Sequence, residues 1–226
     1  MSRSIVHRFL LASAVLLCLA FPATPAAAAP ETPEVRRGHG VLAFTAFTQS
    51  GEVFPEPSLE FGPAVEYGLT DRAAVRAFWH EQRYNDPRSR DSRLADLGLK
   101  YEVTPDLAVE GFVESNWDDR NSATVYGFGL FAGKQFGRAY GSVRWQALAL
   151  PYLGEYYWYD QLAATGSYAL TPQLNFLGGV TATLDVGIDW RGSYGLEWQP
   201  DSNWAICVSR FTDRRDLTQL GVEYRF

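Results

Sequence analysis

The chain has 226 residues, a formal net charge of −6, two cysteines and an aromatic content of 15%. Its acidic balance excludes a nucleic-acid-binding protein, because such a protein needs a strongly basic face. The length corresponds to a single domain.

The first 28 residues have the pattern of a cleaved export signal. Arg3 and Arg8 precede the apolar stretch 9–20, and small residues follow, with cleavage predicted after Ala28. The apolar stretch is shorter than the ~20 residues that a spanning helix needs, which argues against a retained anchor. We therefore predict that residues 1–28 are removed on export and that residues 29–40 form a flexible periplasmic leader.

From residue 41 onward, apolar and polar residues alternate in successive segments. Leu97 and Leu99 share one face of their segment, for example, while Asp96 and Lys100 share the other. A period of two predicts β-strands with one apolar and one polar face. No later stretch approaches ~18 consecutive apolar residues, so the sequence predicts no membrane-spanning helix.

The predicted connections are of two kinds, which alternate along the chain. Tight turns rich in Pro, Asp, Asn and Gly are predicted at 69–73, 103–107, 136–140, 170–174 and 199–203. Longer polar loops are predicted at 48–56, 84–93, 116–122, 151–157, 185–192 and 212–216. Together they predict about twelve antiparallel strands of ~10 residues, the length of a tilted spanning strand. Short turns on one side and long loops on the other are typical of outer-membrane barrels.

Aromatic residues gather near both kinds of connection. Near the long loops lie Trp79, Tyr84, Trp117, Tyr157, Trp158, Tyr159 and Trp190, and near the tight turns lie Tyr67, Tyr101, Phe136, Tyr140, Tyr168, Trp198, Trp204 and Tyr224. Two belts are what amphipathic rings form at the two interfaces of a membrane, although Tyr and Trp also favour strands in general. We therefore predict that the apolar face contacts lipid and that the polar face surrounds a closed interior.

The last residues, LGVEYRF, repeat the alternation, with Leu220, Val222, Tyr224 and Phe226 on the apolar face. This stretch resembles the C-terminal signature of bacterial outer-membrane β-barrel proteins. The resemblance implies a location in the bacterial outer membrane, contact with its lipid and lipopolysaccharide, and recognition of these four residues by the barrel assembly machinery. It also implies that the last strand closes the barrel against the first. We predict an all-β fold, a closed antiparallel up-and-down transmembrane β-barrel over residues 41–226.

A narrower resemblance concerns residues 80–102. This segment is similar to the first hairpin of the small twelve-stranded oligogalacturonate and sialic-acid porins, and also to barrel domains attached to polysaccharide-export proteins. The porins line their pore with many arginines, whereas the inner face predicted here has an acidic surplus. The matching segment also falls in the second hairpin rather than the first.

The parity of each strand selects the residues that face the interior. The predicted lumen-lining residues are Glu60, Glu66, Arg76, His80, Asp96, Lys100, Glu102, Glu110, Glu114, Arg144, Gln146, Glu197 and Glu223, together with Arg225. Because rings of charge select permeant ions, their acidic surplus predicts a narrow porin-like channel for small polar or cationic solutes. The alternatives are a non-conducting structural or adhesion barrel that acts through its outer loops, or a polysaccharide-export pore.

Catalysis is not predicted, and neither is a cofactor. A hydrolase needs a nucleophile within reach of a histidine that a third group orients. His80 could be combined with Glu81 and with Ser115 or Ser122, but no local spacing supports the combination. A lipid-modifying outer-membrane enzyme is therefore the third interpretation.

The predicted outer loops contain two charged clusters. Acidic and amide side chains that suit either calcium or ordinary turns are Asp118, Asp119, Asn121, Asp185 and Asp189. Basic side chains that suit either lipopolysaccharide phosphates or a solvated loop are Arg83, Arg88, Arg90 and Arg93. Neither cluster has the spacing of a known metal motif, so no metal is predicted.

Overall fold

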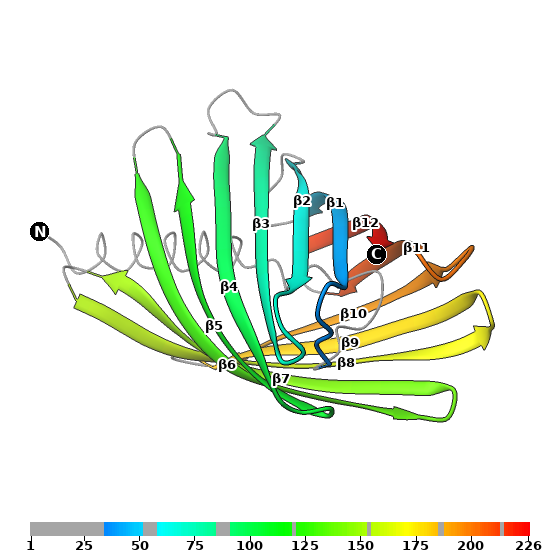
Figure 1. Cartoon of the computed structure of the whole chain (residues 1–226). Helices are drawn as coiled ribbons and strands as arrows, with labels where there is room; N and C mark the ends of the chain where they lie inside the picture. Colours follow the sequence, from blue (N-terminus) through cyan, green and yellow to red (C-terminus); the bar gives the residue numbers. More distant parts are fainter. Residues whose placement is uncertain are drawn as a thin grey trace, which may run out of the picture.

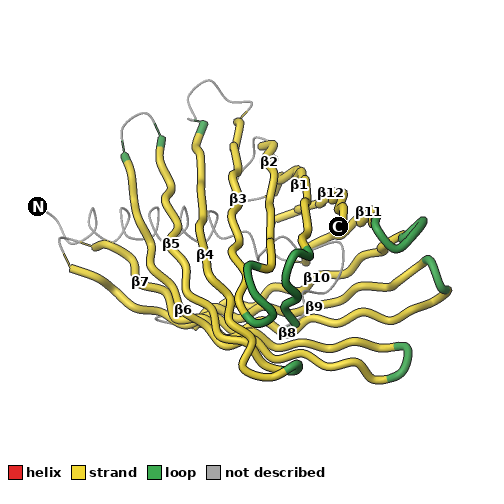
Figure 2. Tube along the Cα trace, viewed as in Figure 1, coloured by secondary structure: helices red, strands yellow, loops and turns green. Residues whose placement is uncertain are grey.

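The computed structural model describes residues 34–51, 58–84, 91–118, 121–152, 155–184, 188–212 and 215–226. The predicted signal, 1–28, and the start of the predicted leader lie outside these ranges. Figure 2 shows the described residues as strands joined by short connections. Among the described residues, no helix has the length and the apolar character that crossing a membrane requires.

Twelve antiparallel strands make up this part of the chain. Their bounds are β1 Gly40–Gly51, β2 Ser58–Gly68, β3 Ala73–Tyr84, β4 Ser92–Thr104, β5 Leu107–Trp117, β6 Ser122–Phe136, β7 Ala139–Tyr152, β8 Glu155–Thr171, β9 Leu174–Leu184, β10 Ile188–Trp198, β11 Trp204–Thr212 and β12 Arg215–Arg225. Each strand pairs with its neighbours in sequence, and β1 pairs with β12 to complete the ring (Figure 1). The closing register runs from Val41 opposite Arg225 to Gly51 opposite Arg215. The predicted closed antiparallel barrel is confirmed.

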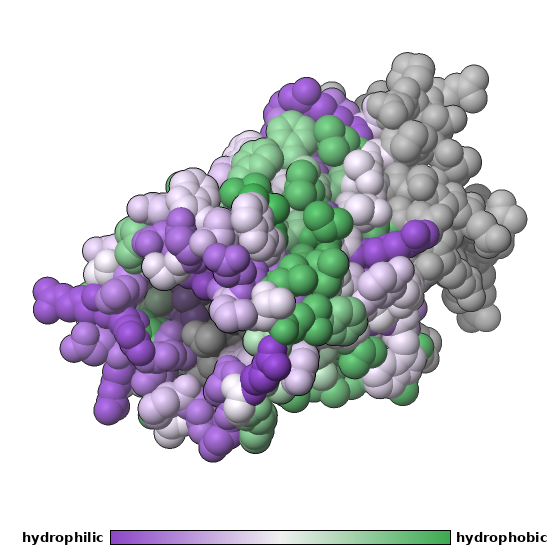
Figure 3. All heavy atoms as spheres, turned by 90° about the vertical axis from the view of Figure 1, so that its right-hand side faces the viewer, coloured by the Kyte–Doolittle hydropathy of each residue, from purple (hydrophilic) through white to green (hydrophobic). Residues whose placement is uncertain are grey.

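The two faces of the sheet are the reverse of those in a water-soluble barrel. On β4, Leu97 and Leu99 are 61% and 62% exposed, whereas Asp96 and Lys100 between them are 4% and 6% exposed. Apolar side chains also face outward on the other strands, while the inner face holds buried charged residues together with apolar ones such as Val125 and Phe131. Figure 3 shows a band of hydrophobic residues across the outer surface, with hydrophilic residues gathered beside it. This arrangement suits hydrocarbon outside and a hydrated interior.

Aromatic side chains contact one another near both ends of the barrel. Near the end with the 85–91 connection, the ring centroids of Trp79 and Trp117 are 5.2 Å apart. Near the opposite end, those of Trp204 and Tyr224 are 4.8 Å apart. Rings of this kind prefer the water–hydrocarbon boundary, so the two groups delimit the apolar band.

The predicted long loops at 151–157, 185–192 and 212–216 are wrong in their extent. Strand β7 continues to Tyr152 and β8 begins at Glu155, while β10 and β12 begin at Ile188 and Arg215. At these ends charged residues stand next to aromatic ones, as Asp189 does next to Trp190, and the backbone continues to pair although the composition suggests a loop. Likewise β8, with 17 residues, is longer than the ~10 that span the hydrocarbon.

Candidate functional site: the charged interior

A network of ion pairs crosses the interior wall from β3 to β7. Arg76 Nε lies 3.5 Å from Asp96 Oδ1, and Arg76 Nη1 lies 3.1 Å from Glu110 Oε2. Glu110 Oε1 lies 3.2 Å from Arg144 Nε and accepts a 3.0 Å hydrogen bond from the Gln146 amide. All five side chains are largely buried, so each charge needs the partner that it has.

Glycines on the intervening strands allow these contacts between strands that are not neighbours. A Cβ at Gly98 on β4 would lie 2.9 Å from Arg76 Nε, and one at Gly129 on β6 would lie 3.1 Å from Glu110 Oε1. The Arg76 side chain therefore lies along the wall over Gly98, and the Glu110 side chain lies along the wall over Gly129. This orientation takes them along the wall rather than toward the barrel axis.

The two arginines of the network also lie over aromatic rings. The guanidinium carbon of Arg76 is 5.1 Å from the centre of the Phe112 ring, and that of Arg144 is 4.9 Å from the centre of the Phe131 ring. Such contacts add to the ion pairs when the cation is desolvated. The rings therefore fix the direction in which each guanidinium points.

His80 is held by groups other than those considered from the sequence. Its Nδ1 lies 2.8 Å from Glu60 Oε1, and its Nε2 lies 3.4 Å from Thr45 Oγ1. Glu81 points away from the interior and pairs with Arg83, and Ser115 contacts Thr124, so the combinations of His80 with Glu81 and Ser115 are not formed. The order hydroxyl, histidine, carboxylate is that of a hydrolase triad. However, Thr45 and His80 are 3% and 1% exposed, which encloses the hydroxyl away from any lipid substrate.

The end of the predicted leader is fixed to one mouth of the barrel. We call residues 34–39 the strap. Val35 is buried and its backbone N–H donates to Glu102 Oε2 at 2.7 Å, while Gly38 N donates to Gly68 O at 2.9 Å. This part of the predicted leader therefore lies against the barrel, because the strap exchanges backbone hydrogen bonds with the end of β2.

A small cavity lies between the strap and the barrel wall. Its volume is about 240 Å³, and its lining includes Glu34, Arg36, His39, Glu66 and Arg225. The charges around it are paired: Arg36 with Glu34, and Glu66 with Lys100. The lining also includes Val35, Val41 and Phe226, so the cavity is of mixed polarity.

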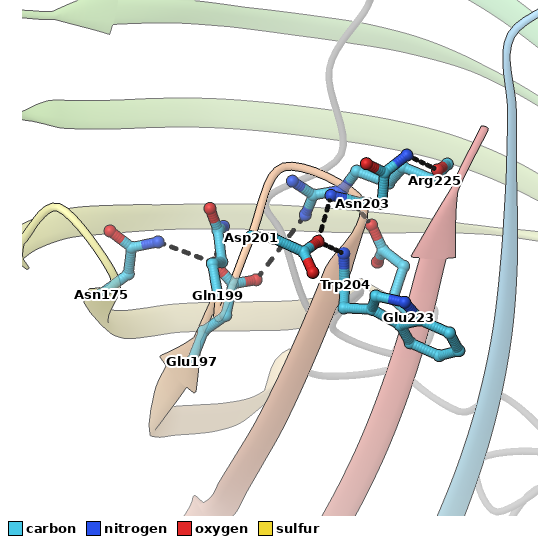
Figure 4. A network of polar contacts seen from close by, with 8 residues as sticks. All are labelled: Asn175, Glu197, Gln199, Asp201, Asn203, Trp204, Glu223 and Arg225. Atoms are coloured by element: carbon cyan, nitrogen blue, oxygen red, sulfur yellow. Dashed lines mark hydrogen bonds and ion pairs between the residues drawn. The ribbon is translucent and has the colours of Figure 1, made fainter.

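A second polar network lies near the turn between β10 and β11 (Figure 4). Glu197 is fully buried and accepts hydrogen bonds from the amides of Asn175 and Gln199. Arg225 Nε donates to Glu223 Oε1 at 2.5 Å, and Arg225 Nη2 lies 4.0 Å from Glu197 Oε2. The network joins β9, β10 and β12 and so stabilises the closing side of the barrel.

The residues predicted to line the lumen all lie on the inward-facing side of their strands. Those buried in the structure are His80, Asp96, Lys100, Glu110, Glu114, Arg144, Gln146, Glu197 and Glu223, and those partly buried are Glu60, Glu66, Arg76, Glu102 and Arg225. Cys207 is a free, buried thiol beside Gly221. Thr45, Phe112 and Phe131 also belong to the interior but were not predicted. Parity was the signal that could have identified them: Phe112 is two residues from Glu110 on β5, Phe131 is two residues from Gly129 on β6, and Thr45 is opposite Gly62, two residues from Glu60 on β2.

The remaining predicted residues lie outside the barrel interior. Leu220 and Phe226 are 50% and 48% exposed on the outer face, and the recognition of this strand by assembly machinery stays a prediction. Arg88, Arg90, Asp119 and Asp185 fall outside the described residues. Within the described ranges, no three His, Cys, Asp or Glu side chains come together as metal ligands.

Comparisons with known proteins show the fold. The sequence matches no family model and no curated protein. The structure is similar to the KdgM porin in complex with disordered oligogalacturonate, with a TM-score of 0.59 and 10% identity over 82% of this chain and 99% of that one. The NanC porin gives 0.58 and 10% over 81% and 98%. An outer-membrane channel from Pseudomonas putida F1 gives 0.59 and 11% over 87% and 98%. At the level of fold, these likenesses agree with the predicted similarity to small twelve-stranded porins.

Proposed function

We propose that this protein spans a bacterial outer membrane and provides a narrow passage for small polar or cationic solutes. The observation that carries the proposal is the inverted barrel, with Leu97 and Leu99 outside and Asp96 and Lys100 enclosed. Hydrocarbon cannot solvate charges or unpaired backbone groups, so a closed ring with this polarity suits a bilayer. Porins and an outer-membrane channel share the fold, which supports passage as the function.

The orientation of two interior side chains bears on the width of the lumen. Arg76 and Glu110 lie over Gly98 and Gly129 rather than along the barrel radius. Barrels of about eight strands are filled by their side chains, whereas sixteen or more enclose an aqueous channel. Twelve strands lie between these limits, and because most inward-facing side chains are buried, any path between them is narrow.

The sign of the interior charge supports cations over anions. Among the inward-facing residues of the described strands, acidic side chains outnumber basic ones, and rings of carboxylates favour cations. The KdgM porin was solved with oligogalacturonate, an acidic sugar polymer. An acidic polymer is a poor match for the acidic interior of this barrel.

Planar-bilayer recording of the purified, folded protein tests the proposal. We expect a single-channel current and a reversal potential, in a KCl gradient, that favours K⁺ over Cl⁻. The double variant Glu110→Gln with Glu114→Gln should reduce this preference, because it removes two interior carboxylates. The matched control is Glu81→Gln, which removes a carboxylate from the outer face of β3. A selectivity that is the same in the double variant and the wild type would contradict the assignment of these carboxylates.

The pairing of the interior charges favours one alternative, a non-conducting structural barrel. Arg76, Arg144 and His80 each contact an acidic partner, and paired charges can solvate a closed interior without any flow. Folded protein that gives no current above the bilayer baseline would favour this alternative. Folding can be checked independently by the heat-dependent electrophoretic mobility of the barrel.

A further inference from the structure

One part of the interior wall is accessible from within the barrel, and it lies on β8, β9 and β10. Thr165 lies well inside β8, which runs from Glu155 to Thr171, and it is exposed. Its hydroxyl lies 2.7 Å from that of Ser142, which is buried on the inner face of β7. Because the ring of strands is closed, a side chain on its inner face is exposed at this depth only where no other side chain covers it. The wall beside Thr165 therefore borders the lumen.

The accessible wall continues over the next two strands. Thr165 is opposite Gly179 on β9, and Gly179 is opposite Ser193 on β10. Both Gly179 and Ser193 are partly exposed. A Cβ at Gly179 would lie 3.0 Å from Ser193 Oγ and 3.1 Å from Thr165 Cγ2. The Thr165 and Ser193 side chains therefore border the space over Gly179, which a side chain on β9 would otherwise take.

The next row of residues on these strands has the same character. Ala163, Thr181 and Arg191 lie opposite one another on β8, β9 and β10, and all three are partly exposed. Arg191 Nη2 lies 3.3 Å from Asp189 Oδ2, so its charge is paired. Short side chains therefore leave this wall open over two successive rows, and its polar groups are mainly hydroxyls.

The wall that carries the ion-pair network, from β3 to β7, is more closed. Glu110 and Arg144 are 6% and 7% exposed, and Phe131 beside them is 2% exposed. A solute inside the barrel therefore has more contact with β8 to β10 than with this network. The interior carboxylates still act on it, because charges in a cleft with low-dielectric walls focus their field on the space between them.

We propose that solutes pass along the inner face of β8, β9 and β10, in contact with Thr165, Gly179 and Ser193. Hydroxyl groups both donate and accept hydrogen bonds, so they replace part of the hydration shell of small uncharged or cationic solutes. The buried carboxylates of β3 to β7 set the preferred sign of charge from a distance. This inference deepens the proposed function and rests on it, since it assigns the residues that a passing solute touches.

Cysteine labelling of the folded protein in lipid vesicles tests which residues border the path. The reagent is 2-(trimethylammonium)ethyl methanethiosulfonate, a fixed cation that does not cross lipid, and mass spectrometry follows the reaction. Thr165→Cys and Ser193→Cys should react at least about tenfold faster than Ser209→Cys, because the reactivity of a thiol depends on its exposure. Ser209 is the matched control, since it lies on the inner face of β11 but is 3% exposed.

Two further controls complete the labelling experiment. Val180→Cys replaces a residue that is 40% exposed on the outer face of β9, where hydrocarbon excludes the charged reagent, so it should react as slowly as Ser209→Cys. The wild type gives the background from the native cysteines. Equal rates for Thr165→Cys and Ser209→Cys would overturn the inference.

The current through labelled protein tests whether solutes touch this wall. Labelling of Thr165→Cys should lower the single-channel K⁺ current by about twofold or more, because it adds a bulky group and a positive charge to a narrow cation path. The modification follows folding, so a loss of current is not a failure to fold. The wild type treated with the same reagent should keep its current. An unchanged current in fully labelled Thr165→Cys would overturn the inference.

The outcome is distinguishable from that of the proposed function. A wild-type current together with slow labelling of Thr165→Cys would retain the channel and remove this path. Fast labelling of Thr165→Cys in folded protein that gives no current would retain the accessible wall but remove the proposed function, and passage along β8 to β10 with it.

Discussion

The interior of this barrel depends on particular glycines as much as on its charges. At Gly127 a Cβ would lie only 2.2 Å from the Phe112 ring, so the ring uses the space that a side chain on β6 would occupy. Phe112 in turn supports the guanidinium of Arg76 at 5.1 Å from its centre. The absence of one side chain on β6 therefore positions a charge on β3.

Substitution of Gly127 by Ala should destabilise the folded barrel by about 1–3 kcal/mol, the usual cost of overpacking a filled site. The free energy of unfolding in urea, measured in lipid vesicles, gives the value. Gly141→Ala is the control, because no atom lies within 4 Å of a Cβ at that position. Similar stabilities for the two variants would show that the Phe112 ring moves aside without cost.

Among the elements, the strap is the one that the alternation pattern does not account for. It is not paired with a strand along its length. Backbone hydrogen bonds to Gly68 and a hydrogen bond to the Glu102 carboxylate hold it against the barrel mouth. The carbonyl of Arg36 lies where a Cβ of residue 68 would be. Only glycine at residue 68 allows this close approach.

Gly68→Ala should therefore release the strap without opening the barrel. The expected result is faster cleavage by trypsin after Arg36 and Arg37, by about tenfold or more, since proteolysis reports local opening. Limited digestion followed by mass spectrometry measures the rate and the site. Gly141→Ala again serves as the control, and an unchanged rate in Gly68→Ala would mean that the strap does not depend on this contact.

At the scale of the whole molecule, the orientation of the sheet determines where a new charge is tolerated. Leu97 lies at the middle of β4 and points outward, whereas Leu69 follows the end of β2 at the turn. The cost of a charge on a lipid-facing position depends on its depth in the bilayer.

Leu97→Arg should thus lower the free energy of unfolding in lipid vesicles by about 2–4 kcal/mol, and Leu69→Arg by about 0–1 kcal/mol. Equilibrium unfolding of both variants in the same vesicles provides the comparison. Equal losses at the two positions would contradict a lipid-facing outer surface.

Much of this architecture could be predicted from the sequence, because a lipid-facing barrel imposes strict alternation. Asp96, Lys100, Glu110 and Glu114 were assigned to the interior by parity alone. Strand ends could not be predicted equally well, since the alternation is lost outside the apolar band, as at Tyr152.

The contacts between side chains of the interior could be predicted less well from the sequence. Arg76 reaches Glu110 on the second strand along, across Gly98, and His80 meets Thr45 from the second strand in the other direction. Such contacts depend on the register of three strands at once. Parity identifies which side chains share the interior, but not which of them touch.

The pairing of β1 with β12 has a consequence for how the protein is made. This seam joins the two most distant strands in the sequence, so every earlier hairpin keeps an open edge until the last strand arrives. An open edge in hydrocarbon leaves backbone groups without partners. In a bilayer the ring can therefore close only when β12 pairs with β1, and any intermediate without β12 would expose an unpaired strand edge to hydrocarbon.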